Sequence, residues 1–179
     1  MTEGDKRLVV GLLILLLALS KSIFAASDSD DHDVTIELGE VALIDINSTA
    51  TITLTTAAPT AGGEPPTGDT DNSKLLYYTS VVAAGESRNI TVNWAGSDSA
   101  PGLSLKVEAT SVPAGCGTAA AQVTIGKTAA NLITNIGGCA TGTGASGAEI
   151  TYTLTVDDTS QIEAGPNTVT ITFTLTGPA

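Results

Sequence analysis

The feature that most constrains the fold is a regular alternation of apolar residues with threonine. Residues 169–175 read Val-Thr-Ile-Thr-Phe-Thr-Leu, and four other segments alternate in a similar way. Side chains two residues apart lie on the same face of a β-strand, so each segment has one apolar and one polar face. Antiparallel sheets with one buried face show this pattern. The alternating segments are residues 51–55, 89–94, 103–110, 150–156 and 168–176.

Weaker apolar runs predict further strands at residues 75–82, 122–125 and 132–136. Residues 34–46 also contain alternating apolar residues, but Gly39 interrupts them. This indicates either one bent or bulged strand or two short strands. We expect the part after Gly39 to be central and buried. After the N-terminal leader the chain shows no helical period. About nine strands predict an all-β fold, a single β-sandwich with Greek-key or jelly-roll connections.

The first 26 residues have the composition of a secretory signal peptide that forms a helix. Lys6 and Arg7 precede an uncharged run at residues 8–19, which is short for a membrane span. Cleavage after Ala25 or Ala26 would release a secreted or cell-surface protein with no membrane contact. Two alternatives stay open: a retained signal anchor, and a type IV pilin-like helix cut near Arg7.

The chain is acidic, with 19 Asp and Glu against 7 Lys and Arg and a formal net charge of −12. Such a chain cannot neutralise a row of phosphates, so a nucleic-acid partner is not expected. Residues 27–33 hold four aspartates and His32, and we predict a flexible acidic tail there. The β-sandwich domain is expected to span residues 34–179.

Cys116 and Cys139 are the only cysteines. In a secreted domain they are expected to form a disulfide. By closing the loop between them, the disulfide would stabilise the folded state by about 3 kcal/mol in the chain-entropy model. The alternative is two free buried thiols.

Three other patterns concern ligand chemistry. Residues 142–147 match G-x-G-x-x-G, but a strand follows instead of a helix, so we interpret them as a glycine-rich turn. Asp69 and Asp71 are spaced like calcium-loop ligands, although Lys74 stands where such a loop needs glycine. Calcium is therefore the one cofactor that the sequence leaves open. With one histidine and no paired nucleophile, an enzyme is not expected.

Residues 75–94 are predicted to form a hairpin that carries Tyr77, Tyr78 and Trp94. Aromatic side chains on a strand surface can stack on sugars. These three are therefore the candidate ligand-binding residues, with polysaccharide as the possible ligand. A long loop at residues 57–73 is a second candidate binding element.

The pattern as a whole resembles a group of secreted, largely uncharacterised, Thr-rich all-β proteins of bacteria. The resemblance rests on EVALIDI at 40–46, YYTS at 77–80, C-x-TGTG at 139–144, ITYTL at 150–154 and VTITFTLT at 169–176. More remotely, the order of leader, tail and all-β domain is similar to TasA-like and archaeal bundling pilin-type fibre subunits. That similarity implies that an N-terminal strand of one subunit completes the sheet of the next.

Val34, Ile36 and Leu38 have the alternation that a donor strand needs, and Gly39 can supply the bend behind them. We therefore predict a non-enzymatic extracellular subunit of a filament, pilus or biofilm matrix that self-associates into a homopolymer. The alternative is a monomeric cell-surface adhesion module that binds carbohydrate or depends on calcium. If no exchange occurs, residues 34–38 are an ordinary edge strand of their own domain.

Overall fold

The computed structural model describes residues 29–95 and 101–178. The chain divides into two compact units, Met1–Glu37 and Leu38–Ala179. In the first unit the described residues, 29–37, form no helix or strand. The predicted signal peptide at residues 1–26 lies outside the described residues, as do the first two residues of the predicted acidic tail.

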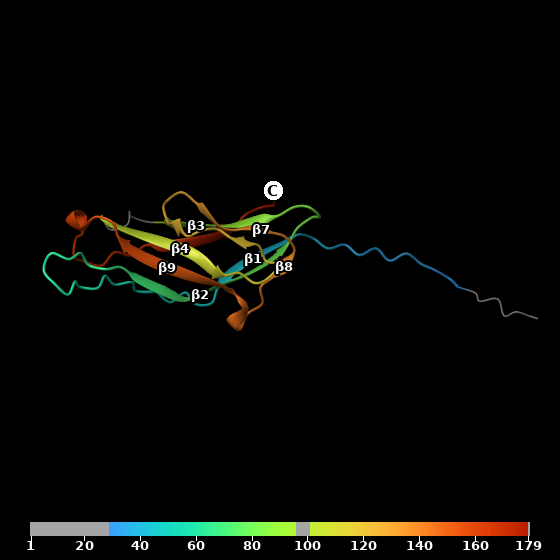
Figure 1. The fold of residues 1–179 in the computed structure, drawn as a ribbon. Coiled ribbons are helices and arrows are strands. Elements are labelled where there is room, and N and C mark those ends of the chain that lie inside the picture. The colour runs from blue at the N-terminus through green and yellow to red at the C-terminus, as the bar shows by residue number, and fades with distance from the viewer. Residues whose placement is uncertain (1–28, 96–100, 179) are drawn as a thin grey trace, which may run out of the picture. The chain divides into compact units, whose positions relative to one another are not determined.

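The second unit is all-β and consists of two antiparallel sheets packed face to face, as predicted (Figure 1). The first sheet has the order β1 (Val41–Ile46), β2 (Asp69–Val81), β9 (Ala148–Val156), β4 (Leu103–Ser111) and β6 (Val123–Thr124), with β8 (Cys139–Ala140) also paired to β2. The second sheet has the order β10 (Thr170–Leu175), β3 (Arg88–Ala95), β7 (Ala130–Ile136) and β5 (Thr118–Ala119). Two 3₁₀ turns, Gly144–Ser146 and Thr159–Gln161, are the only helical elements of the described chain.

The core lies between the two sheets and is built by the alternation read from the sequence. Inward side chains of the central strands are fully or almost fully buried, whereas their threonine and asparagine neighbours face out. The strand interiors contribute Leu76, Tyr78, Ile90, Val92, Trp94, Val107, Leu132, Ile133, Ile136, Ile150 and Tyr152 to this core.

The predicted hairpin at residues 75–94 is wrong. β2 belongs to the first sheet and β3 to the second, so the link between them crosses the sandwich instead of turning within one sheet. The cross-strand partners of β2 are β1, β8 and β9, and those of β3 are β10 and β7.

Two boundaries also differ from expectation. Residues 69–73, expected in a long loop, begin β2, so the loop ends at Gly68. Residues 51–55 alternate as predicted, with Ile52 and Leu54 packed against the core, but they form no strand. The Lys74 ammonium binds the Ser48 and Ala50 carbonyls at 3.0 and 2.6 Å, and the Asp69 carboxylate accepts from the Thr55 N–H. Side chains thus satisfy backbone groups that a neighbouring strand would otherwise pair.

Candidate functional site

The strands at one side of the sandwich leave long stretches of backbone unpaired. The sheets end at β1 and β6 and at β10 and β5, and β5 and β6 have only two residues each. β1 and β10 have six residues each and come close together, β1 at the edge of the first sheet and β10 at the edge of the second (Figure 1). A central, buried position for residues 41–46 was expected from their apolar character, and it is wrong because β1 is an edge strand.

The side where β1 and β10 meet is incompletely covered, and we call it the β1–β10 seam. No residue of either strand is fully buried, whereas every second residue of the neighbouring β3 is buried. The apolar side chains at this side pack against the core but stay partly exposed: Ile44, Ile52, Leu54, Val169, Ile171, Phe173 and Leu175. The seam is therefore the part of the core that one more strand could cover.

A buried arginine joins the two edges at one end of the seam. Arg88, on β3, is 6% exposed; its Nη2 lies 2.8 Å from Glu40 Oε2 and its Nη1 donates to the Thr176 carbonyl at 3.0 Å. Glu40 directly precedes β1 and Thr176 directly follows β10. The point at which the N-terminal segment leaves the sandwich domain is thus fixed beside the end of β10.

The predicted donor residues lie just before this point. Val34, Ile36 and Leu38 are 70%, 88% and 78% exposed and belong to no strand. Three large apolar side chains spaced by two thus face solvent in the described structure. Both interpretations of residues 34–38, an edge strand of their own domain and a donor strand for another copy, stay predictions.

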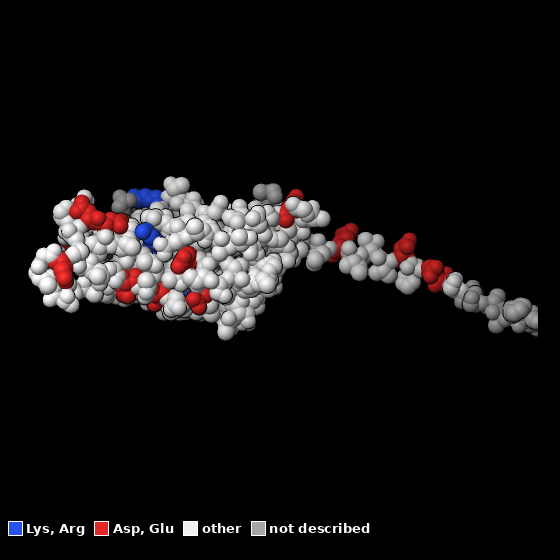
Figure 2. All heavy atoms as spheres, viewed as in Figure 1, with Lys and Arg blue, Asp and Glu red and all other residues white. Residues whose placement is uncertain are grey.

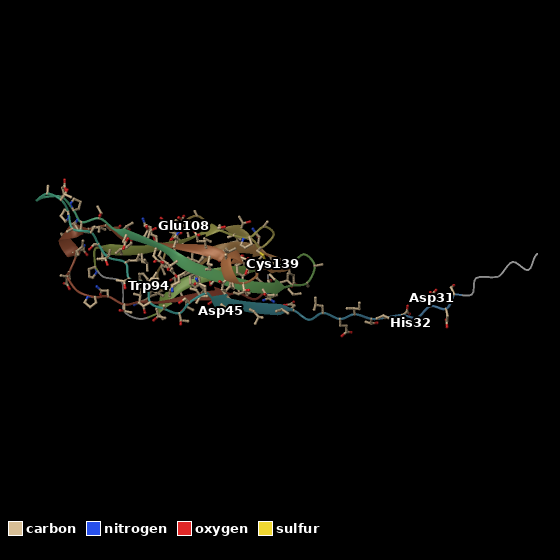
Figure 3. All side chains as sticks on the ribbon, turned by 90° about the horizontal axis from the view of Figure 1, so that it is seen from below. Asp31, His32, Asp45, Trp94, Glu108 and Cys139 are labelled. Carbon is tan, nitrogen blue, oxygen red and sulfur yellow. A yellow bond between two sulfur atoms is a disulfide. The ribbon has the colours of Figure 1, made fainter. Side chains whose placement is uncertain are left out.

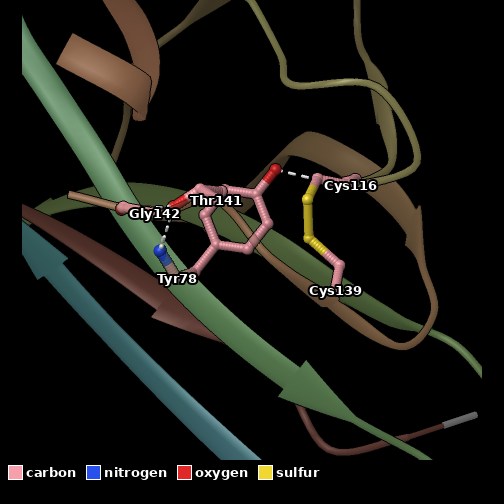
Figure 4. The surroundings of a disulfide bond; sticks show 5 residues. All are labelled: Tyr78, Cys116, Cys139, Thr141 and Gly142. Carbon is pink, nitrogen blue, oxygen red and sulfur yellow. Dashed lines mark hydrogen bonds between the residues drawn. A yellow bond between two sulfur atoms is a disulfide. The ribbon is translucent and has the colours of Figure 1, made fainter.

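The predicted disulfide is present and joins the two sheets (Figure 4). Cys139 begins β8 in the first sheet, and Cys116 lies just before β5 in the second, with Cα atoms 5.3 Å apart. Tyr78 packs beside it: its hydroxyl donates to the Cys116 carbonyl at 2.7 Å, and its N–H donates to Thr141 Oγ1. A structural disulfide is typical of oxidising compartments, including the cell exterior.

The three candidate sugar-binding aromatics do not form one surface. Tyr78 and Trp94 are core residues at 2% and 8% exposure; Trp94 is labelled in Figure 3. Tyr77 points to the other face of β2, where its hydroxyl donates to the Gly144 carbonyl and its ring packs on Gly147. The aromatic side chain thus holds the glycine-rich turn at residues 142–147 in place, and no aromatic platform results.

The pKa values of two buried tyrosines predict a spectroscopic signature. Burial raises the pKa of Tyr78 and of Tyr152 to about 12, with the Asp71 carboxylate adding to the effect on Tyr152. In the unfolded chain both groups ionise near pH 10, so the folded state holds more protons between pH 10 and 12 and its stability falls as pH rises through that range. We expect absorbance titration near 295 nm to show delayed ionisation of these two phenols, and Tyr78→Phe to remove one of them. Ionisation of all tyrosines near pH 10 without unfolding would contradict the burial.

The candidate calcium ligands make hydrogen bonds to the chain itself. The Asp69 carboxylate accepts from the Thr55 and Thr70 N–H groups, which lower its pKa, and Asp71 accepts from the backbone and hydroxyl of Ser73. Within residues 29–95 and 101–178, no three His, Cys, Asp or Glu side chains are grouped as a metal site would require. In the structure these two aspartates fix the start of β2.

Comparison of the chain with protein-family models, curated proteins and solved structures found no match. The resemblance to secreted all-β proteins and to fibre subunits therefore stays a prediction, as does the expectation that the protein is not an enzyme. The described part of the chain contains no helix long and apolar enough to cross a membrane.

Proposed function

We propose that the protein is a non-enzymatic extracellular structural subunit that assembles into a filament or matrix by exchanging its N-terminal strand. One observation carries the proposal: Val34, Ile36 and Leu38 are exposed in alternation outside any strand, in a chain whose sandwich leaves the β1–β10 seam partly uncovered. One copy of the chain thus offers the strand that another copy lacks.

The energetics favour association. Burying three apolar side chains contributes on the order of 5–8 kcal/mol before ordering costs are subtracted. Backbone hydrogen bonds to an unpaired edge add specificity, because the edge accepts only an extended segment. The donor and the acceptor are different surfaces, so each subunit that donates still offers its own seam, and the contact propagates instead of closing as a dimer.

The charge of the chain adds a condition. The formal net charge is −12, and acidic side chains are scattered over the face of the domain seen in Figure 2. Like charges on neighbouring subunits repel, and salt screens that repulsion. Assembly is therefore expected to be faster at physiological ionic strength than at low salt.

The test is a change of the donor side chains alone. The protein, produced from the full-length chain with its own leader, should form fibres visible by negative-stain electron microscopy and elute as large species in size exclusion. Val34→Ser, Ile36→Ser and Leu38→Ser together should leave a monomer, because the variant loses the apolar contribution of about 5–8 kcal/mol.

The matched control keeps the apolar pattern: Val34→Ile, Ile36→Val and Leu38→Ile together should still assemble. The free energy of unfolding of the monomer should be equal in both variants, since the three side chains are exposed. Monomers from the unaltered chain at physiological salt, or fibres from the serine variant, would overturn the proposal.

A further inference from the structure

Resting on strand exchange as the proposed function, we infer that the acceptor is the outer edge of β10 of a second copy, and that residues 34–38 bind there as an antiparallel strand. The opposite edge of the seam, β1, is the competing position. The two edges differ in backbone orientation, in protection and in the side chains that lie beside them.

The backbone of β10 is open at the residues whose side chains face the core. Thr176 N donates to Asn89 O, and Trp94 N donates away from β10, to Gly126 O. With Ile171 opposite Trp94 and Phe173 opposite Val92, the alternation of an antiparallel ladder turns the N–H and C=O groups of Ile171, Phe173 and Leu175 toward the outer edge. No hydrogen bond to these six groups is found within the described residues.

β10 also lacks the devices that normally protect an edge strand. Its sequence, Thr-Ile-Thr-Phe-Thr-Leu, has no charged residue, no proline and no register shift against β3. A six-residue uncharged edge of high β-propensity is a ready template for another strand. The other edge strands of the described sandwich differ from β10. β5 and β6 are only two residues long, and β1 carries an acidic residue.

β1 is protected at one of the corresponding groups. Asn47 N donates to Leu75 O, so residues 42, 44 and 46 turn their backbone groups away from β2. The Asp45 carboxylate, labelled on β1 in Figure 3, accepts the Ile46 N–H at 2.8 Å. An incoming strand would have to displace this bond and lie beside a carboxylate, whereas β10 requires neither.

The pattern of the donor fixes the register. Val34, Ile36 and Leu38 must face the core beside Ile171, Phe173 and Leu175, and an antiparallel strand does this with Val34 opposite Leu175, Ile36 opposite Phe173 and Leu38 opposite Ile171. Glu37 then lies opposite Thr172 on the outer face. This pair is of the closer kind, with Cα atoms about 4.5 Å apart, which a disulfide can bridge.

The test cross-links pairs of full-length variants. Each variant carries one added cysteine and keeps the native disulfide. Glu37→Cys is mixed in turn with Thr172→Cys, Thr174→Cys and Leu43→Cys under mild oxidation, and the linked peptides are identified by mass spectrometry. All three acceptor positions are exposed, so the variants are matched in access. We expect the 37–172 link to exceed each of the other two by roughly tenfold, because cysteines with Cα atoms beyond about 7 Å cannot bridge without movement.

The other outcomes each overturn the inference at a stated point. A dominant 37–174 link would show a parallel strand or an antiparallel strand shifted by two residues, and a dominant 37–43 link would place the donor on β1; in both cases the proposed filament function would survive. Links only between two copies of Thr172→Cys or of Thr174→Cys would show β10 pairing with itself in a closed dimer. If the unaltered chain does not assemble, the proposed function and the inference fail together.

Discussion

Replacing Cys116 and Cys139 together by alanine lowers the free energy of unfolding by about 3 kcal/mol. The bridge spans 23 residues of sequence and joins β8 of the first sheet to the residues just before β5 of the second. Without it the unfolded chain gains the conformational freedom of that loop, while most native contacts stay unchanged. In a domain of this size the change corresponds to a fall of roughly 10 °C in Tm.

Chemical denaturation of the oxidised protein, the reduced protein and the double alanine variant measures this effect. The reduced protein and the variant should agree, since both lose the same constraint. Tyr78→Phe with the disulfide intact is the local control: it removes the hydroxyl that donates to Cys116 and should cost about 1–2 kcal/mol by leaving that carbonyl unpaired. Equal stability of the oxidised and reduced proteins would contradict the prediction.

The alternation at residues 169–175 was enough to predict β10, because a period of two depends only on neighbouring residues. The partner of each strand is not local information. β2 and β3 are joined by a short link that contains Gly85 and is typical of a hairpin turn, but each strand has its own buried face, and the chain crosses from one sheet to the other. Tyr78 and Trp94 consequently became core residues rather than a binding surface.

The candidate site was predicted on its donor side only. The apolar alternation at 34, 36 and 38 could be read from the sequence, but their exposure could not, and the seam depends on which strands end each sheet. Arg88 was missed although the sequence carries its signal: it occupies the same face as Ile90, Val92 and Trp94, at the one position of that face that is charged. A lone charge in phase with an apolar alternation indicates a buried ion pair, and the partner, Glu40, lies 48 residues away.

Breaking the ion pair between Arg88 and Glu40 is the second change expected to lower the free energy of unfolding strongly. The loss depends on which of the two partners is replaced. Glu40→Ala leaves a buried guanidinium with the Thr176 carbonyl as its remaining partner, and an uncompensated buried charge is costly. Since Glu40 is itself 47% exposed, its contribution is screened by solvent, and we expect a loss of about 2 kcal/mol rather than the larger values of fully buried pairs. Arg88→Met removes the charge together with its desolvation cost and leaves a carboxylate that water can reach. It should cost less, about 1 kcal/mol, from the unpaired Thr176 carbonyl.

The double variant distinguishes this account from a simple loss of contacts. If the penalty of Glu40→Ala comes from the orphaned guanidinium, then adding Arg88→Met should restore part of the lost stability, which additive contacts would not do. Denaturant unfolding of the two single variants and the double variant completes the cycle. Glu86→Ala, an exposed glutamate two residues before Arg88, is the matched charge control and should change stability by less than about 0.5 kcal/mol. A double variant less stable than Glu40→Ala alone would show that Arg88 acts through its packing rather than through its charge.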